Sequence, residues 1–481
     1  MKAKQSRSGF VGGTVWTTIS FVVVTIVYLL RISILTRYLD KSDFGLVAIV
    51  LMILGFTNIF ADLGVSSALL SQNNVNKKEY SSLYWGGGII SILLYFVVTL
   101  STPLFSRFYN EPFLNTLIPV MAVDLIISAI GRQFAVFKQK DFRFKELAII
   151  KIVSELFSLL VAAVLAYNGY GIWSLVASIL VASFINSVLN FILGIKLHPL
   201  SFNLNYSQTK HLYKIGFYQA GSQVLDYISS QIDILILGKM IPMADMGVYS
   251  IIKNLVLKIY SSINQIVTKV AVPIFSKLKD NTVKFREKYL EISSGIMLVN
   301  TVCYLIIMVN SSETLSLFYG SQYSKYADIL QFLCVWGVFS SIVNCASVLI
   351  VISTGRTDLG FRWTQLRLFL NPLFIVVGAY FGGILGTAIA QAIYSFITIF
   401  FYREVVVKKI LPSLSNRDFL LVLYRPILLA ATFYCVFYFA RNYVPLYLTM
   451  NVYLKYSLSA IVIAGCYFLV FKNSIRNVVK L

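Results

Sequence analysis

Apolar stretches of helix length follow one another along the whole chain, and this feature constrains the fold more than any other. A transmembrane helix needs about 20 predominantly apolar residues to cross the hydrocarbon core of a bilayer. The sequence therefore predicts an all-α polytopic membrane protein with about 14 transmembrane helices. The expected spans are residues 12–36, 44–70, 83–106, 113–137, 147–167, 171–195, 213–239, 245–271, 288–310, 326–352, 361–380, 383–402, 419–440 and 448–471.

The overall composition excludes the other broad classes of protein. Hydrophobic residues make up 58% of the 481 residues and charged residues 13%, whereas a soluble domain averages about 45–50% and about 25%. A disordered chain is excluded because aliphatic and aromatic residues dominate. The net charge of +21 does not indicate nucleic-acid binding, because the Lys and Arg residues form short clusters between apolar stretches.

The basic residues also predict the orientation in the membrane. Lys and Arg gather in every second segment between the spans, beginning with the N-terminal one. The intervening segments hold only Arg37, Lys41, Arg107, Lys239, Lys325 and Arg441. Because cytoplasmic loops carry an excess of Lys and Arg, we expect a multi-pass protein of the cell (inner) membrane with both termini in the cytoplasm.

Two pairs of segments resemble each other in the same order along the chain. Arg37-Tyr-Leu-Asp-Lys-Ser-Asp43-Phe-Gly45 aligns without gaps with Lys239-Met-Ile-Pro-Met-Ala-Asp245-Met-Gly247. Tyr167-Asn-Gly-Tyr-Gly171-Ile resembles Tyr380-Phe-Gly-Gly383-Ile with one residue of slippage. Six spans separate the two copies in each pair, so the membrane direction is preserved and the repeat is parallel. The alternative is a chance similarity between apolar segments of low diversity.

This repeat predicts how the chain divides. An N-terminal lobe of six helices would occupy residues 1–196, and a second lobe of six helices residues 213–405. A cytoplasmic loop, 197–212, would join the lobes, and residues 406–481 would add a connection and a final helix pair. We expect the main cavity to lie between the two lobes.

Polar residues on the seventh and eighth spans form two stripes. An ionised side chain at the bilayer centre costs about 2.5–3.5 kcal/mol, so such residues normally face a cavity or a partner. The stripes are Gln219, Gln223, Asp226, Ser230 and Asp233, then Asn254, Lys258, Ser261, Gln265 and Thr268. The first covers an arc of about 80° at 3.6 residues per turn. The alternative for both is interhelical hydrogen bonding that only holds helices together.

Ionisable residues of the first lobe allow more than one interpretation. Asp124 and Arg132 lie two turns apart on one face, where structural pairing and substrate contact both remain open. Lys151 and Glu155 are spaced i,i+4, which favours a structural ion pair. Asp62 lies close to the inner end of the second span and is suited to gating or to capping.

Several motifs spread over nearly the whole chain resemble the Wzx-type polysaccharide flippases. They are Arg37-Tyr-Leu-Asp, Phe60-Ala-Asp62-Leu-Gly64, Arg132-Gln-Phe, Lys140-Asp-Phe-Arg143-Phe, Gly169-Tyr-Gly171-Ile-Trp173 and Thr354-Gly355-Arg356-Thr-Asp358. The resemblance extends to the colanic-acid and teichuronic-acid exporters. That family belongs to the multidrug/oligosaccharidyl-lipid/polysaccharide (MOP) exporter superfamily, which also contains the multidrug and toxin extrusion (MATE) proteins and lipid II flippases.

The resemblance implies a MATE-like, V-shaped bundle of two lobes with a known kind of substrate. It would move undecaprenyl-pyrophosphate-linked oligosaccharide from the cytoplasmic to the outer leaflet by alternating access, for the synthesis of lipopolysaccharide or exopolysaccharide. We expect cations and amides inside the membrane to bind this substrate. The candidate substrate-binding residues are Arg31, Arg132, Lys258, Arg367, Gln219, Gln223, Asn254 and Gln265.

The energy source and the partners follow from the same interpretation. The chain lacks a GxxxxGK[ST] phosphate loop, so we expect coupling to an H⁺ or Na⁺ gradient rather than ATP hydrolysis. Carboxylates inside the membrane are the candidates for ion coupling, namely Asp62, Asp124, Asp226 and Asp233. No cofactor, metal or nucleic acid is expected. The expected partners are the lipid-linked oligosaccharide, membrane lipids and other polysaccharide assembly proteins.

Two other functions are the alternatives. A MATE-type multidrug exporter is compatible with the charges of the spans, which hold nearly equal numbers of acids and bases. A membrane glycan polymerase or ligase would need a long outer loop with catalytic carboxylates or arginines, and the predicted outer connections are short. We therefore expect a protein that is not an enzyme and has no catalytic residues.

Overall fold

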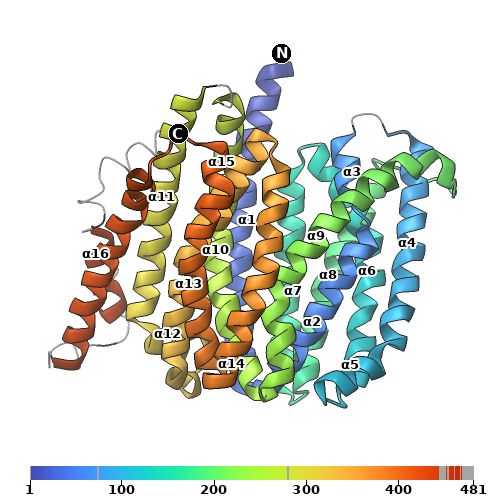
Figure 1. The fold of residues 1–481 in the computed structure, drawn as a ribbon. Helices are drawn as coiled ribbons and strands as arrows, with labels where there is room; N and C mark the ends of the chain where they lie inside the picture. The colour runs from blue at the N-terminus through green and yellow to red at the C-terminus, as the bar shows by residue number, and fades with distance from the viewer. Residues whose placement is uncertain are drawn as a thin grey trace. The chain divides into compact units, whose positions relative to one another are not determined.

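A computed structural model describes residues 2–72, 75–278, 281–443, 451, 454–459, 461–465 and 467, and this part of the chain is helical without any β-strand (Figure 1). In chain order the elements are α1 (Lys2–Tyr38), α2 (Lys41–Asp62), α3 (Val65–Ser71), α4 (Lys77–Leu100), α5 (Thr102–Tyr109), α6 (Leu114–Lys140), α7 (Phe144–Tyr167), α8 (Ile172–Ile195), α9 (Tyr206–Met240), α10 (Met243–Leu278), α11 (Thr282–Val309), α12 (Ser311–Tyr319), the 3₁₀ turn η1 (Ser321–Tyr326), α13 (Ala327–Thr354), α14 (Thr357–Tyr402), the π-helical turn η2 (Arg403–Val407), α15 (Lys408–Ile410) and α16 (Asn416–Tyr443).

The described helices include nine that are long and apolar enough to cross a membrane. These are α1, α2, α4, α6, α7, α8, α11, the segment Thr357–Ile410 that contains α14, and α16. The segment Thr357–Ile410 has 54 residues, more than twice the length of about 20 residues that one crossing requires. The all-helical membrane fold predicted from the sequence is confirmed, and the count of fourteen spans stays a prediction.

Glycines mark the points where the backbone interrupts a helix. One of these points lies inside a predicted span, and another lies at a predicted boundary between spans. The predicted span 44–70 is interrupted, because α2 ends at Asp62 and the backbone turns left-handed at Leu63 (φ 41°) and Gly64 (φ 65°). A Cβ on Gly64 would also meet the backbone of Gly216 in α9. The expectation of one continuous helix is therefore wrong there, because hydropathy does not register a left-handed backbone.

The expected boundary between the spans 361–380 and 383–402 is confirmed as a kink inside α14. The helix breaks at Gly382 and Gly383, and Gly383 has φ 54° and ψ −134°. Gly171 immediately precedes α8 and has φ 54° and ψ −132°. An L-residue with a side chain rarely adopts this conformation. The two glycines that align in the second pair of similar segments thus carry the same backbone conformation.

The first pair of similar segments meets in space. A Cβ added to Gly45 would meet the carbonyl oxygen of Met243, and a Cβ added to Gly247 would meet the carbonyl oxygen of Lys41. Lys41 and Met243 are separated by the same number of residues as Gly45 and Gly247. The first turns of α2 and α10 therefore cross in reciprocal fashion, as equivalent parts of a parallel repeat would.

The described chain forms two compact units, unit 1 (Met1–Val248) and unit 2 (Tyr249–Leu481). In unit 1, α7 lies beside α1 and α8, α6 beside α8 and α4, and α9 beside α2 and α3 (Figure 1). In unit 2, α13 packs on α14 and α11, and α11 packs on α16. The helix α10 begins in unit 1 and continues into unit 2. The lobe boundaries predicted from the repeat stay a prediction.

Candidate functional site

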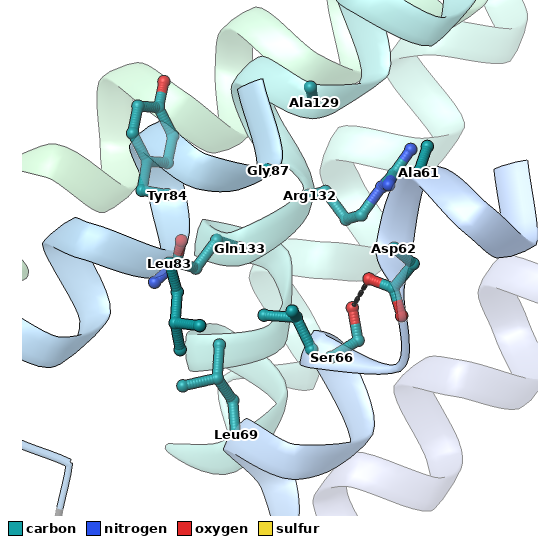
Figure 2. A pocket seen from close by; sticks show the side chains of 11 residues that line it. Ala61, Asp62, Ser66, Leu69, Leu83, Tyr84, Gly87, Ala129, Arg132 and Gln133 are labelled. Carbon is teal, nitrogen blue, oxygen red and sulfur yellow. Dashed lines mark hydrogen bonds between the residues drawn. The ribbon is translucent and has the colours of Figure 1, made fainter. Parts of the chain in front are cut away.

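A polar cavity lies in unit 1 among α2, α3, α4 and α6 (Figure 2). Its lining residues are Ala61, Asp62, Val65, Ser66, Leu69, Leu83, Tyr84, Gly87, Ala129, Arg132 and Gln133. The free volume is about 30 Å³, which is comparable to the space one water molecule occupies in the liquid. The cavity is therefore large enough for a water molecule or a small ion and too small for a sugar.

The break between α2 and α3 shapes one wall of this cavity. Because the chain turns at Leu63 and Gly64, Ser66 in the first turn of α3 comes back over the end of α2. The Ser66 hydroxyl donates to Oδ1 of Asp62 at 2.5 Å, as Figure 2 shows. Asp62 thus ends its helix with its carboxylate turned into the cavity and already bound by one donor.

Arg132 lines the same cavity from α6, with its guanidinium on the same side as Asp62 (Figure 2). Its Nη2 donates to Oδ1 of Asn58 in α2 and to the hydroxyl of Ser128 one turn earlier, both at 3.0 Å. Asp62 and Asp124 lie within electrostatic range of Arg132. No ion pair within 4 Å joins Arg132 to either carboxylate among the residues described.

Hydrogen bonds between α4 and α6 hold this wall in place. The side-chain amide of Gln133, which is 7% exposed, donates to the Tyr80 carbonyl at 2.7 Å. The Tyr84 hydroxyl donates to the Ile130 carbonyl at 3.4 Å. Ile130 and Gln133 lie on either side of Arg132 in α6. The two bonds therefore hold this turn of α6, and Arg132 with it, against α4.

A second charged cluster lies between α1 and α7. Arg31 and Glu155 are 7% and 8% exposed, and Arg31 Nη1 lies 3.5 Å from Glu155 Oε2. Lys151 Nζ approaches the other oxygen, Oε1, at 3.1 Å, which confirms the predicted i,i+4 pair. Arg31 also donates to the Ser158 hydroxyl, and its guanidinium lies 5.6 Å from the centre of the Tyr28 ring. One carboxylate is thus shared by two cations.

Asp124 connects the two charged clusters electrostatically. It accepts a hydrogen bond from Ser183 in α8 and interacts with both Arg132 and Lys151. Its Oδ1 is buried and accepts no hydrogen bond from the residues that the structure describes. Six ionisable side chains of unit 1 therefore alternate in sign and sum to zero. They are Asp62, Arg132, Asp124, Lys151, Glu155 and Arg31.

The polar stripe of the seventh predicted span lies on α9. Tyr227 packs on Gly55, and its hydroxyl donates to the Met52 carbonyl at 2.9 Å, which fixes the rotation of α9 against α2. The stripe lies to one side of Tyr227, where Gln219, Asp226 and Ser230 are exposed and Gln223 is half-buried. Asp233 differs from them, because it is 4% exposed and its Oδ1 accepts from the Ile234 amide at 2.9 Å.

The remaining candidates lie in unit 2. In α10, Asn254 is exposed and Lys258 is half-buried, whereas the side chain of Gln265 lies outside the described residues. In α14 the Arg367 guanidinium lies 5.9 Å from the centre of the Trp363 ring. The contact of all these candidates with a substrate or an ion stays a prediction.

Several residues of the site were missed by the sequence analysis. Asn58 and Ser66 flank Asp62 at i−4 and i+4, a spacing that was visible in the sequence as a polar row. Ser158 and Ser183, in contrast, belong to apolar helices in which serine is common. Nothing in the sequence distinguishes these two serines from the others, since their roles depend on helices far away in the chain.

Known proteins resemble this chain along most of its length. A family model described as "Polysaccharide biosynthesis protein" matches residues 34–328. The chain is 24% identical over 428 residues to the lipopolysaccharide biosynthesis protein WzxC of Escherichia coli (strain K12), covering 88% of this chain and 86% of that protein. It is 25% identical over 404 residues to the teichuronic acid biosynthesis protein TuaB of Bacillus subtilis (strain 168), covering 84% and 83%.

A solved structure shares the fold. The lipid II flippase MurJ, in an inward closed conformation, superposes with a TM-score of 0.75 and 15% identity over 97% of this chain and all of that one. At that identity the likeness establishes the arrangement of helices and no more. Because the family model covers more than half of the sequence, the chain belongs to the polysaccharide biosynthesis protein family of Wzx-like membrane flippases.

Proposed function

We propose that the protein moves undecaprenyl-pyrophosphate-linked oligosaccharide units from the cytoplasmic to the outer leaflet of the cell membrane, for the synthesis of a surface polysaccharide. The observation that carries this proposal is the convergence of ionisable side chains from α1, α2, α6 and α7 inside a membrane unit of this family. The orientation with both termini in the cytoplasm is part of the proposal, as is the absence of covalent chemistry on the glycan.

The cations of the candidate site are suited to a pyrophosphate. An uncompensated anion cannot cross a hydrocarbon layer of about 30 Å, because its hydration must be replaced. Arg132 uses Nη2 for its two hydrogen bonds, and its Nε and Nη1 form none with the described residues. A guanidinium with free N–H groups can bind two phosphate oxygens at once. Arg132 is therefore the residue that we assign to the headgroup, in a state of the transport cycle whose cavity is wider than the present one of about 30 Å³.

The stripe on α9 is suited to the sugar. A carboxylate and amides that face lipid would each be unfavourable, yet Gln219 and Asp226 are exposed on α9, which contains the predicted seventh span. A hydrated route along this face resolves the conflict. Sugar hydroxyls can exchange hydrogen bonds with such side chains as they would with water.

An ion gradient is the energy source that we propose. Asp124 has one buried oxygen that accepts no hydrogen bond from the described residues, and a carboxylate in such a place binds a proton or a sodium ion readily. Asp62 and Asp226 are the other candidates, because one lines the small cavity and the other lies on the exposed stripe.

The test replaces Arg132 in cells that make the polysaccharide. Arg132→Ala should cause lipid-linked oligosaccharide to accumulate in the cytoplasmic leaflet while the protein still inserts at the normal level. Arg132→Lys keeps the charge and loses the two-pronged geometry, so we expect an intermediate defect. The matched control is Arg107→Ala, which removes an exposed arginine of α5 away from the cavity.

Normal surface glycan in the Arg132→Ala strain would remove this residue from the mechanism. An unchanged leaflet distribution together with a new sensitivity to cationic drugs would favour the drug-exporter alternative instead.

A further inference from the structure

A large cavity between α4 and α9 in unit 1 is not used by the proposed transport route. Its volume is about 720 Å³, many times that of the polar cavity beside Arg132. The lining residues are Leu63, Ser82, Gly86, Ile89, Ile90, Leu204, Thr209, Lys210, Tyr213, Lys214 and Phe217. This lining contains two basic residues and no acidic one, with an aliphatic and aromatic wall next to them.

The two basic residues are available to a ligand. Lys210 and Lys214 are one helical turn apart and are both exposed. Neither has an acidic group within 4 Å among the described residues. An ammonium group is a strong partner for a phosphate oxygen. The polar end of the cavity therefore favours an anion over a cation or a neutral group.

The apolar end continues into the membrane. Ile89 and Phe217 are 47% and 70% exposed, so hydrocarbon can reach them. Along α4 the lining runs from Ser82 to Ile90, which is about 12 Å at 1.5 Å per residue. This length is close to half the hydrocarbon thickness of about 30 Å. From its polar end to its apolar end, the lining thus covers most of the depth of one leaflet.

Contacts with the loop before α9 place the polar end at the membrane surface. Ser82 exchanges hydrogen bonds with the Asn205 backbone, at 3.0 Å from the amide and 3.3 Å to the carbonyl. The Trp85 indole donates to the Ser201 carbonyl at 3.2 Å. Tryptophan typically lies at the level of the lipid headgroups. Lys210 and Lys214 follow this loop closely in the chain, so their ammonium groups can reach the phosphates of the bilayer.

We propose that this cavity binds one anionic glycerophospholipid of the leaflet that faces the N-terminus. Its phosphate lies between Lys210 and Lys214, and an acyl chain covers Ile89, Ile90 and Phe217. The bound lipid fills the space between α4 and α9 and fastens the start of α9 to α4. This binding does not depend on what the protein transports.

A longer lipid would need a longer apolar path. A second cavity of about 440 Å³ follows farther along the same two helices, where Leu94, Val97 and Ile228 are among its lining residues. A phospholipid of one leaflet occupies only the cavity with the lysines. A polyprenyl chain would extend into the second cavity, and this difference separates the two occupants.

The test titrates the purified full chain with phosphatidylglycerol and with zwitterionic phosphatidylcholine, and counts bound lipids by native mass spectrometry. The double variant K210Q/K214Q should bind phosphatidylglycerol about 30-fold more weakly, because each basic residue near an anionic lipid contributes a factor of about five. Phosphatidylcholine binding should change little. The matched control is K77Q/K78Q, which removes the same charge at the start of α4, outside the cavity lining.

Two further variants keep the result interpretable. Ile90→Trp fills the proposed acyl site without changing charge and should also displace phosphatidylglycerol, whereas Val97→Trp, in the second cavity, should not. Unfolding temperatures without added lipid show whether each variant folds.

Equal losses in K210Q/K214Q and K77Q/K78Q would overturn the proposal in favour of general surface attraction. Loss in Val97→Trp, or stronger displacement by undecaprenyl pyrophosphate than by phosphatidylglycerol, would overturn it in favour of a polyprenyl lipid.

Discussion

The reciprocal glycine crossing at the start of α2 and α10 gives a prediction that does not depend on function. A Cβ on Gly247 would overlap the Lys41 carbonyl, and a Cβ on Gly45 would overlap the Met243 carbonyl. Both obstacles are backbone atoms, so the first turns of the two helices must separate. Overpacking of this kind typically costs about 1–3 kcal/mol. The better helix propensity of Ala offsets about 0.5–1 kcal/mol of this cost, so Gly247→Ala should destabilise the protein by up to about 2.5 kcal/mol.

Gly45→Ala should cost a similar amount, because the contact is reciprocal. The double variant should cost less than the sum, because helices already pushed apart by one methyl group accommodate the second.

The assay is chemical or thermal unfolding of the purified protein in a fixed detergent. The control is Gly88→Ala in α4, where an added Cβ meets nothing within 4 Å and the helix propensity alone predicts equal or higher stability. If Gly247→Ala were as stable as Gly88→Ala, or the two losses were strictly additive, the reasoning from the crossing would be refuted.

Three more outcomes are expected. Glu155→Gln should lower stability by about 3–5 kcal/mol, since it leaves the buried Arg31 without its carboxylate; an unchanged unfolding midpoint would show that the cluster is hydrated. Asp226→Asn should change the dependence of glycan export on the proton or sodium gradient, measured with ionophores, and an identical dependence would exclude this residue from coupling. Gly171→Ala and Gly383→Ala should each cost about 1–3 kcal/mol, because both glycines have a positive φ that Ala rarely adopts; a neutral result at either position would contradict the shared conformation.

The helices were predictable because the membrane imposes one requirement on every span. The length of the apolar stretches was sufficient to locate α1, α6, α7 and α8. A segment inside the bilayer must form its backbone hydrogen bonds internally, and a helix does so. The break after α2 was not predictable from hydropathy, because apolar residues resume at Val65 and the left-handed φ of 41° at Leu63 leaves no trace in hydropathy. The pairs of similar segments were more informative, since they marked the glycines that turn the chain.

The site was predictable only where its contacts are local. The pair of Lys151 and Glu155 lies within one helix, so spacing was sufficient to predict it. Arg31 meets the same carboxylate from a helix 124 residues away, and no pattern in a single sequence reports that contact. The partners of Arg132 show the same limit, because Asn58 belongs to another helix.

The alternating charges of unit 1 have a consequence for the energetics of transport. Because Asp62, Asp124 and Glu155 already balance Arg31, Arg132 and Lys151, a headgroup that enters near them brings surplus negative charge into a region of low dielectric. A cation that moved outward together with the headgroup would run against an inward gradient and could not drive export. The loaded carrier would instead take its surplus negative charge toward the outer face, and a membrane potential that is negative inside favours this movement by about 2.3 kcal/mol per charge per 100 mV.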